Sequence, residues 1–269
     1  MVSTGLIAAL PEESSTFLRQ LLIWEVSRLG AFPGWRFRLG GLDCRLVQSG
    51  VGPKRAAEAT RALLAEISPG DVAPSGNRGS QAAGVGGILS FGVAGAVQAN
   101  LQIGDVVVVR SVCQLEQGVA GPLARLADLP GEARQAAAEA LRARGARLVD
   151  GTAVTTRGEQ KLDSQSAEME NPVLEMETAA IAAAAAQAGV PLLALRGISD
   201  NPQEPIPLDL AEMLDGEYRL RPGKMLEAVL RRPHILPLLR RFQRNTRQAA
   251  ENVAAAVIAV LGAWHTFSE

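Results

Sequence analysis

The chain has 269 residues, 47% of them hydrophobic, and a formal net charge of −1. This length can bury one full core, and the near-neutral charge excludes a surface that is basic throughout, so nucleic acid is not expected as a partner. Cys44 and Cys113 are far apart in strand-like runs and are expected to be reduced core thiols of a cytoplasmic protein. The N-terminus lacks the positive region of a signal peptide, and no apolar run is long enough to cross a bilayer.

The chain opens with an apolar strand, Gly5 to Leu10, followed by Pro11, Glu12 and Glu13. Proline and acidic residues are typical of the first turn of a helix, where the helix dipole favours negative charge. The local sequence therefore explains the two acids as helix-start residues. A catalytic role for one of them is the alternative.

Two glycine-rich segments follow. Gln48-Ser49-Gly50-Val51-Gly52 precedes a helix, but Arg55 stands where a dinucleotide-binding loop has its third glycine, so NAD binding is rejected. Residues 69–87 are rich in Gly, Ser, Ala and Pro and are predicted to form an exposed loop. In residues 91–95, Phe-Gly-Val-Ala-Gly, the two glycines would let the backbone approach a ligand closely, and residues 103–108 indicate another strand.

Three carboxylates stand in the apolar segment from residue 173 to residue 200. Glu175 and Glu177 point to one face if the segment is extended, whereas as helix-entry acids they need no function. An alanine-rich helix to about Gln187 precedes a buried strand at residues 192–195. Asp200 then falls at the carboxyl end of a core strand, where open α/β sheets hold ligands, and a simple turn is the alternative.

Other kinds of catalytic site are excluded by composition. Histidine occurs only at positions 234 and 265, and neither lies near a serine or cysteine motif. A Ser-His-Asp or Cys-His site is therefore not expected, and no Cys/His cluster has the spacing of a zinc site. Acid-base chemistry must depend on carboxylates, with no metal and no cofactor.

Taken in order, these segments resemble the nucleoside phosphorylase and nucleosidase superfamily. The matching features are the first strand with its acidic turn, the second loop, the central glycine-rich turn, and the Met-Glu and Ser-Asp pairs. The resemblance covers about residues 3 to 200 and a final helix. It implies a three-layer αβα sandwich around a central twisted mixed β-sheet, built as one domain over residues 1–269, and a homodimer.

The resemblance also implies roles for individual residues. Asp200 would protonate the purine, as general acids in apolar pockets can, and Glu13 would activate the attacking water. Glu177 would accept hydrogen bonds from the ribose hydroxyls, and Met176 would pack on the sugar. The remaining predicted substrate-binding residues are Glu175, Ser199, Val93 and Gly92.

Water is the predicted nucleophile. Phosphorolytic members of the superfamily hold phosphate with two arginines, and the corresponding places here are occupied by Ser90 and the acidic turn that contains Glu13. A carboxylate repels a phosphate dianion. Val93 stands where small nucleosidases have a water-contacting serine, which leaves the positioning of water open. Residues 151–172 contain no aromatic side chain to stack on a base, so adenine is implied by the resemblance alone.

The chain departs from compact nucleosidases in an insert at about residues 201–245. Between Arg219 and Arg247 there are nine Lys or Arg residues and one acid, Glu227. The insert resembles the hopanoid-associated phosphorylases, which implies adenosylhopane as the substrate. Its arginine pairs and apolar runs predict peripheral membrane contact through residues 219–247, and a helix pair packed on the body is the alternative.

The sequence thus predicts a purine nucleosidase that cleaves the N-glycosidic bond of a 5′-substituted adenosine and releases adenine. Three alternatives remain: a methylthioadenosine/adenosylhomocysteine nucleosidase, a phosphorolytic nucleoside phosphorylase, and a relative that binds or stores ligand without turning it over. The intact set of Glu13, Glu177 and Asp200 argues against the last.

Overall fold

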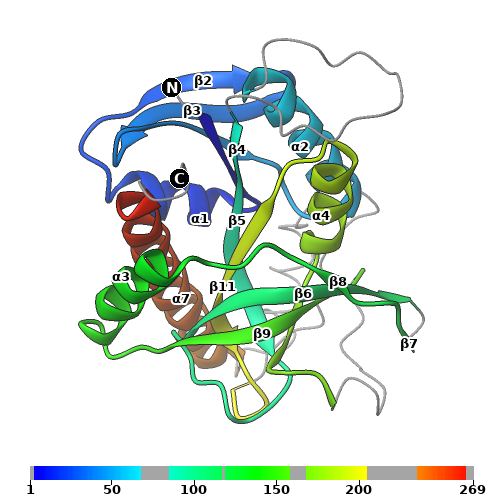
Figure 1. The fold of residues 1–269 in the computed structure, drawn as a ribbon. Helices are drawn as coiled ribbons and strands as arrows, with labels where there is room; N and C mark the ends of the chain where they lie inside the picture. The colour runs from blue at the N-terminus through cyan, green and yellow to red at the C-terminus, as the bar shows by residue number, and fades with distance from the viewer. Residues whose placement is uncertain (1–2, 68–84, 117–118, 158–167, 205–234, 265–269) are drawn as a thin grey trace.

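The computed structural model describes residues 3–67, 85–116, 119–157, 168–204 and 235–264 (Figure 1). The first part contains β1 (Ser3–Ala8), α1 (Pro11–Leu18), β2 (Glu25–Leu29), β3 (Phe32–Leu39), β4 (Leu42–Gln48), α2 (Pro53–Ile67) and β5 (Val85–Ala96). The second part contains β6 (Val106–Glu116), β7 (Val119–Ala120), β8 (Ala124–Arg125), α3 (Gly131–Arg142), β9 (Leu148–Thr155), β10 (Pro172–Glu175), α4 (Thr178–Gln187), β11 (Leu192–Asp200) and α7 (Leu236–Gly262).

The described strands form one mixed sheet in the order β10-β9-β6-β11-β5-β1-β4-β3-β2, with β7 and β8 paired to β6. At its centre β4, β1, β5 and β11 run parallel, whereas β6 and β3 are antiparallel to their neighbours β11 and β4. Strand β10 pairs with β9 on one side and with β5 on the other, so five strands close into a ring. The β1–β4 side of the sheet stays open.

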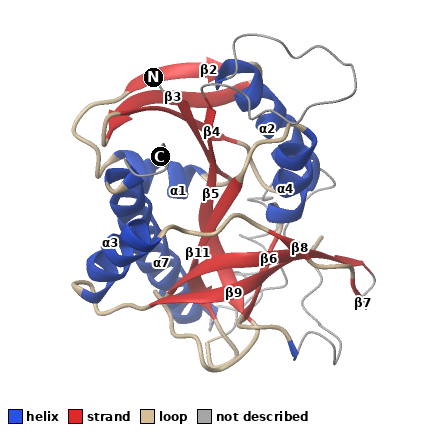
Figure 2. Cartoon of the chain, viewed as in Figure 1, coloured by secondary structure: helices blue, strands red, loops and turns tan. Residues whose placement is uncertain are grey.

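Helices cover both faces of the sheet (Figure 2). Helices α1, α3 and α7 pack on one face, where Phe17 and Leu141 share a core with Leu6 of β1. Helices α2 and α4 pack on the other, where Leu63 shares a second core with Ile7. Successive residues of β1 thus point to opposite layers, as the strand period requires. This confirms the predicted three-layer α/β fold with a mixed sheet.

Some predicted boundaries were wrong. Residues 85–87, assigned to the loop, belong to β5, because pairing with β1 extends that strand back to Val85; residues 68–84 lie outside the described part. By contrast, the predicted strand with Asp200 at its carboxyl end is found as Leu192–Asp200, because pairing with β5 runs along its whole length. The part of the insert that is described beyond Ile235 belongs to α7, continuous with the final helix. Pro237 is tolerated because it lies in the first turn, where no backbone N–H is needed.

The cysteines and the long helices were also the subject of predictions from the sequence. Cys44 and Cys113 are both buried, and neither is in a disulfide, as predicted. Within the described ranges, no helix is long and apolar enough to cross a membrane.

Candidate functional site

The predicted site residues come together where the central parallel strands end. Glu13 lies in the first turn of α1, directly after β1, and Asp200 is the last residue of β11. Both strands flank β5, which carries Gly92, Val93 and Gly95. Parallel strands present their carboxyl ends at the same edge of a sheet, so these groups lie on neighbouring strands at one edge although they are far apart in sequence.

Glu13 is buried, and three backbone amides hold its carboxylate. Oε2 accepts hydrogen bonds from the N–H groups of Ala9 and Leu10 at 2.9 and 2.8 Å, and Oε1 accepts one from Val93 at 2.9 Å. Burial raises the pKa of Glu13, against the lowering effect of these amides and of Arg196. The residue therefore closes the start of its helix and also faces the interior. A role at the start of the helix and a catalytic role are therefore structurally compatible for Glu13.

Two glycines of β5 make room for carboxylates. A Cβ atom at Gly92 would lie 2.6 Å from Oε1 of Glu13, and one at Gly95 would lie 2.5 Å from Oδ2 of Asp200. Both distances are shorter than any real contact of a Cβ atom. In the structure, therefore, these glycines let the carboxylates of Glu13 and Asp200 approach the backbone of β5 closely.

Glu177 is the N-cap residue of α4 and is buried beside Glu13. Its Oε1 accepts a hydrogen bond from the N–H of Gly52 at 2.8 Å, and Oε2 has no hydrogen-bond partner among the described residues. Burial, followed by the negative charge of Glu175, raises the pKa of Glu177 to about 8. The neighbouring Met176 is partly exposed. Glu177 thus has one oxygen fixed by the protein and one available.

A small cavity of about 10 Å³ lies between these groups. Its charged lining comes from Glu13, Glu177 and Arg196, and Ser49 and Ser90 add polar side chains. A polar cavity of this size holds about one water molecule. The cavity therefore suits a single water beside two carboxylates.

Arg196 is a charged residue of the candidate site that the sequence interpretation missed. It is buried in the middle of β11, and its Nη2 donates to Thr178 Oγ1 at 2.7 Å, to Ser90 Oγ at 3.0 Å and to Glu175 Oε2 at 3.3 Å. An arginine inside an otherwise apolar strand was the available signal, because charged residues are rarely buried unless paired. Its guanidinium brings one positive charge to the cavity lined by Glu13 and Glu177.

Glu175 is the ion-pair partner of Arg196. Its Oε1 accepts from Thr155, and its Oε2 also accepts from the N–H groups of Glu177 and Thr178 at 3.0 and 2.8 Å. Burial favours the neutral acid, but Arg196 and these donors outweigh it and hold the pKa of Glu175 below its ordinary value. Both oxygens are occupied by protein donors. In this structure Glu175 therefore orients its neighbours, whereas Glu177 has an oxygen left for a ligand.

Asp200 combines burial with a free oxygen. Ser199 donates to its Oδ1 at 2.7 Å, while Oδ2 accepts no hydrogen bond from the described residues. Burial raises the pKa of Asp200, and the bond from Ser199 opposes this in part. A carboxyl group in this setting retains a proton at a higher pH than an exposed aspartate and can donate it.

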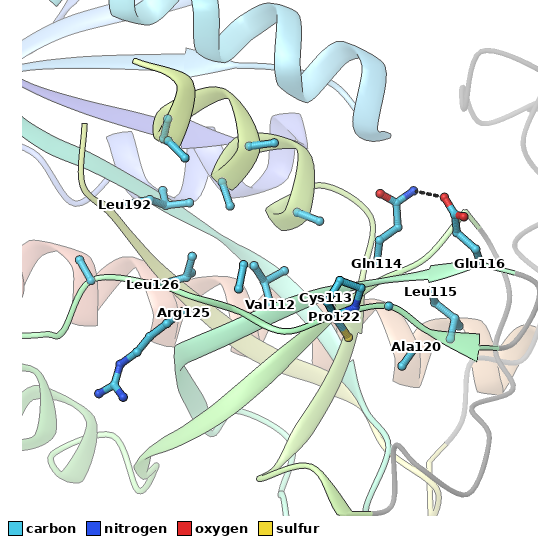
Figure 3. Close-up of a pocket in the computed structure, with 18 of the residues that line it drawn as sticks. Val112, Cys113, Gln114, Leu115, Glu116, Ala120, Pro122, Arg125, Leu126 and Leu192 are labelled. Atoms are coloured by element: carbon cyan, nitrogen blue, oxygen red, sulfur yellow. Dashed lines mark hydrogen bonds between the residues drawn. The ribbon is translucent and has the colours of Figure 1, made fainter. Parts of the chain in front are cut away.

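A much larger groove of about 1360 Å³ lies between α4 and the strands β6 to β8 (Figure 3). Its wall on the sheet side includes Val112 and Leu126, and Arg157 also lines it. None of Glu13, Glu177 and Asp200 borders it. The groove is therefore separate from the carboxylates, although α4 is common to both.

Clusters of acids, histidines and cysteines suited to a metal ion are absent from the described residues. The polar groups brought together at the strand ends can instead donate a proton, accept one and hold a water molecule. This arrangement is suited to acid-base chemistry on a small organic ligand.

Comparison with known proteins places this geometry in a family. A family model described as the phosphorylase superfamily matches residues 3–261. A 5′-methylthioadenosine/S-adenosylhomocysteine nucleosidase of Colwellia psychrerythraea is 25% identical over 234 residues, covering 80% of this chain and 90% of the relative. The crystal structure of the enzyme of that name and organism with adenine has a TM-score of 0.66 at 21% identity and covers 97% of this chain and 95% of its own. A futalosine hydrolase of Helicobacter pylori has a TM-score of 0.65 at 17% identity and covers 96% and 97%. Together with the fold, the match over nearly the whole length establishes that the chain belongs to the phosphorylase superfamily.

Proposed function

We propose that this protein is a purine nucleosidase that hydrolyses the N-glycosidic bond of a 5′-substituted adenosine. Two observations carry the proposal: the partly buried acid Asp200 at the end of β11, and the one-water cavity lined by Glu13, Glu177 and Arg196 near the ends of neighbouring strands. Relatives named as methylthioadenosine/adenosylhomocysteine nucleosidase and futalosine hydrolase have the same fold. Their names support a nucleoside substrate.

The proposed mechanism assigns one task to each group. Asp200 transfers its proton to N7 of the purine while the bond between C1′ and N9 breaks. Water from the small cavity attacks C1′, and Glu13 takes the proton that the water loses. Glu177 accepts hydrogen bonds from the ribose hydroxyls through its free oxygen, and Arg196 offsets part of the carboxylate charge. The products are adenine and a free 5′-substituted ribose.

Water is favoured over phosphate by the size and charge of the cavity. A volume of about 10 Å³ accommodates a water molecule but not a phosphate ion. Above the raised pKa values of Glu13 and Glu177, two carboxylates against one guanidinium would also repel a dianion. A phosphorolytic enzyme is therefore the second candidate, distinguished by its product.

The deciding experiment incubates the protein with methylthioadenosine, adenosylhomocysteine and a 5′-alkylated adenosine, with and without phosphate. Adenine and free sugar should form at equal rates in both buffers. Strict dependence on phosphate, with a sugar 1-phosphate as product, would replace hydrolysis by phosphorolysis. If no substrate is cleaved but equilibrium dialysis detects binding, the protein is a ligand-binding relative.

The preferred 5′ substituent distinguishes the two hydrolytic alternatives. The proposal of adenosylhopane depends on the insert at about residues 201–245, of which residues 205–234 lie outside the described part. A preference for a long apolar 5′ group over methylthioadenosine in kcat/KM would support it. The reverse preference would favour the methylthioadenosine/adenosylhomocysteine assignment.

Peripheral membrane contact through residues 219–247 is part of the same proposal. Leu236, Leu238 and Arg240 are exposed at the start of α7, which supports contact. Arg241 and Arg247 form ion pairs with acids of the protein, which supports the packing alternative. Replacing Arg231, Arg232, Arg240 and Arg241 by serine should weaken retention of the protein on acidic vesicles. Turnover of a small, water-soluble adenosine substrate should not change.

We also propose that the protein is a homodimer. The groove beside α4 is lined by alanines of that helix, including Ala183, together with apolar side chains of the sheet, and small residues allow another chain to pack closely. Ala183→Glu should shift the protein from dimer to monomer in sedimentation velocity. Gln135→Glu, exposed on α3, is the matched control. A protein that is monomeric at all concentrations would contradict this part.

A further inference from the structure

The connection between α1 and β2 carries an exposed apolar run. Leu22 is 101% exposed, Ile23 80%, Trp24 41%, and Val26, at the start of β2, 77%. A side chain as exposed as Leu22 contacts almost nothing of its own chain. Single exposed apolar residues are common on soluble proteins, but four within five positions indicate an interaction surface.

This run continues into a larger apolar surface. Val26 lies directly opposite the partly buried Trp35 in the β2–β3 pair, and β2 is the outermost strand of the sheet. Leu22, Ile23 and Trp24 border a groove of about 860 Å³ whose floor includes Phe37. We call the four residues Leu22, Ile23, Trp24 and Val26, with the groove beneath them, the apolar tip.

Arginines surround the apolar tip. Arg28 and Arg38 are exposed and form no ion pair within the described residues, while Arg36 and Arg45 line the groove and are paired with Glu66 and Asp43. With Arg36 and Arg45 neutralised by their partners, Arg28 and Arg38 face one exposed acid, Glu25, beside the tip, a net charge of +1. The tip is therefore apolar at its centre, with a small positive excess around it.

We propose that the apolar tip docks on the surface of an anionic lipid bilayer. Aliphatic side chains at the tip would enter the interfacial region, and tryptophan prefers that depth because its ring is apolar with one polar N–H. The arginines would meet lipid phosphates, each adding attraction that salt screens. A second copy of the chain is a poorer occupant, because a symmetric contact would bring two cationic surfaces together.

This surface is distinct from the active site and from the start of α7. None of the tip residues lines the cavity with the carboxylates. Ile258 borders the groove, whereas Arg240 lies 18 residues earlier in α7, about 27 Å away along the helix. Binding through the two surfaces can therefore be separated by mutation, and failure of either leaves the proposed nucleosidase activity untouched.

The test uses the full-length protein and vesicles of phosphatidylcholine with one third phosphatidylglycerol. The wild type should sediment with them at low salt and be released at high salt, and Trp24 fluorescence should shift to the blue on binding, a shift absent from Trp24→Phe. The double variant Leu22→Ser/Ile23→Ser should bind about tenfold more weakly or worse. Both side chains are so exposed that the fold should be kept, which circular dichroism checks.

Leu123→Ser is the matched control, since Leu123 is an exposed leucine, at 55%, outside the tip. It should bind vesicles like the wild type. Failure of the wild type to bind acidic vesicles at low salt overturns the proposal, and so does undiminished binding of the double variant. If the double variant instead dissociates a dimer, the tip is a protein interface and the lipid proposal is wrong.

Discussion

Replacing Glu177 by glutamine should stabilise the protein, and increasingly so as the pH rises. Burial and Glu175 raise the pKa of Glu177 to about 8, from 4.5 for an ordinary glutamate. The folded protein favours the protonated form of Glu177. This contribution to stability is fully present below pH 4.5, the ordinary pKa, and is lost as the pH rises through about 8. Glutamine has no proton to lose and is free of this penalty.

The two pKa values give the size of the effect. The unfolded chain ionises above pH 4.5 and the folded protein only above about 8, so this residue should lower the unfolding free energy by about 1 kcal/mol at pH 5, about 3 kcal/mol at pH 7 and about 5 kcal/mol at pH 9. The difference in unfolding free energy between Glu177→Gln and wild type should therefore grow by about 4 kcal/mol from pH 5 to pH 9. Comparing pH values removes any constant cost of repacking the amide.

Urea unfolding followed by circular dichroism measures this difference directly. Glu58→Gln, at an exposed position of α2, is the control and should run parallel to the wild type at every pH. Glu177→Gln should meanwhile lose kcat/KM, because the carboxylate proposed to accept the ribose hydroxyls is gone. Such an exchange of activity for stability is common at functional sites. Parallel pH profiles for Glu177→Gln and wild type would refute the reasoning.

Further tests address the other groups of the site. Asp200→Asn should reduce base release by about 10² to 10⁴ while keeping ligand affinity, measured by single turnover and calorimetry; activity within threefold of wild type would remove this acid from the mechanism. Arg196→Met should lower the unfolding free energy by about 3 to 5 kcal/mol, because it leaves a buried carboxylate without its cation, and an unchanged urea midpoint would contradict the ion pair. Gly95→Ala places a methyl 2.5 Å from Oδ2 of Asp200 and should lower kcat more than it changes KM; equal kinetics would show that the acid can move without loss. The acidic limb of the kcat/KM profile should fall as the pH drops below about 8, since Glu177 must be ionised to accept two hydroxyls, and a plateau down to pH 6 would argue against that role.

The sequence was sufficient for the type of the elements that carry the candidate site residues. Apolar periodicity identified the alanine-rich helix, found as Thr178–Gln187, and the buried strand that precedes Asp200. The sequence also placed Glu13 and Asp200 directly at strand ends, and both strands pair with β5 in the structure. This worked because parallel strands in one sheet bring their carboxyl ends to a common edge, whatever the intervening sequence.

Element boundaries that depend on contacts with distant parts of the chain were harder to predict from the sequence. The first residues of β5 are glycine-rich and look like loop, yet Gly87 pairs with Thr4 of β1. The start of α7 contains Pro237, which reads as a break but occupies the first helical turn. In both places the local preference was weak, and neighbours distant in sequence decided the conformation.

Only the tertiary structure decided the electrostatics of the site. The sequence presents Glu175 and Glu177 as a pair, but folding gives Glu175 the guanidinium of Arg196 and leaves Glu177 with a raised pKa. It also sets Gly92 and Gly95 against the carboxylates of Glu13 and Asp200. The sequence by itself determined which ionisable groups are available and which elements carry them. The protonation state of each group was decided by the fold, because the free energy of a buried charge depends on the charges and dipoles within a few ångströms, and those come from residues far apart along the chain.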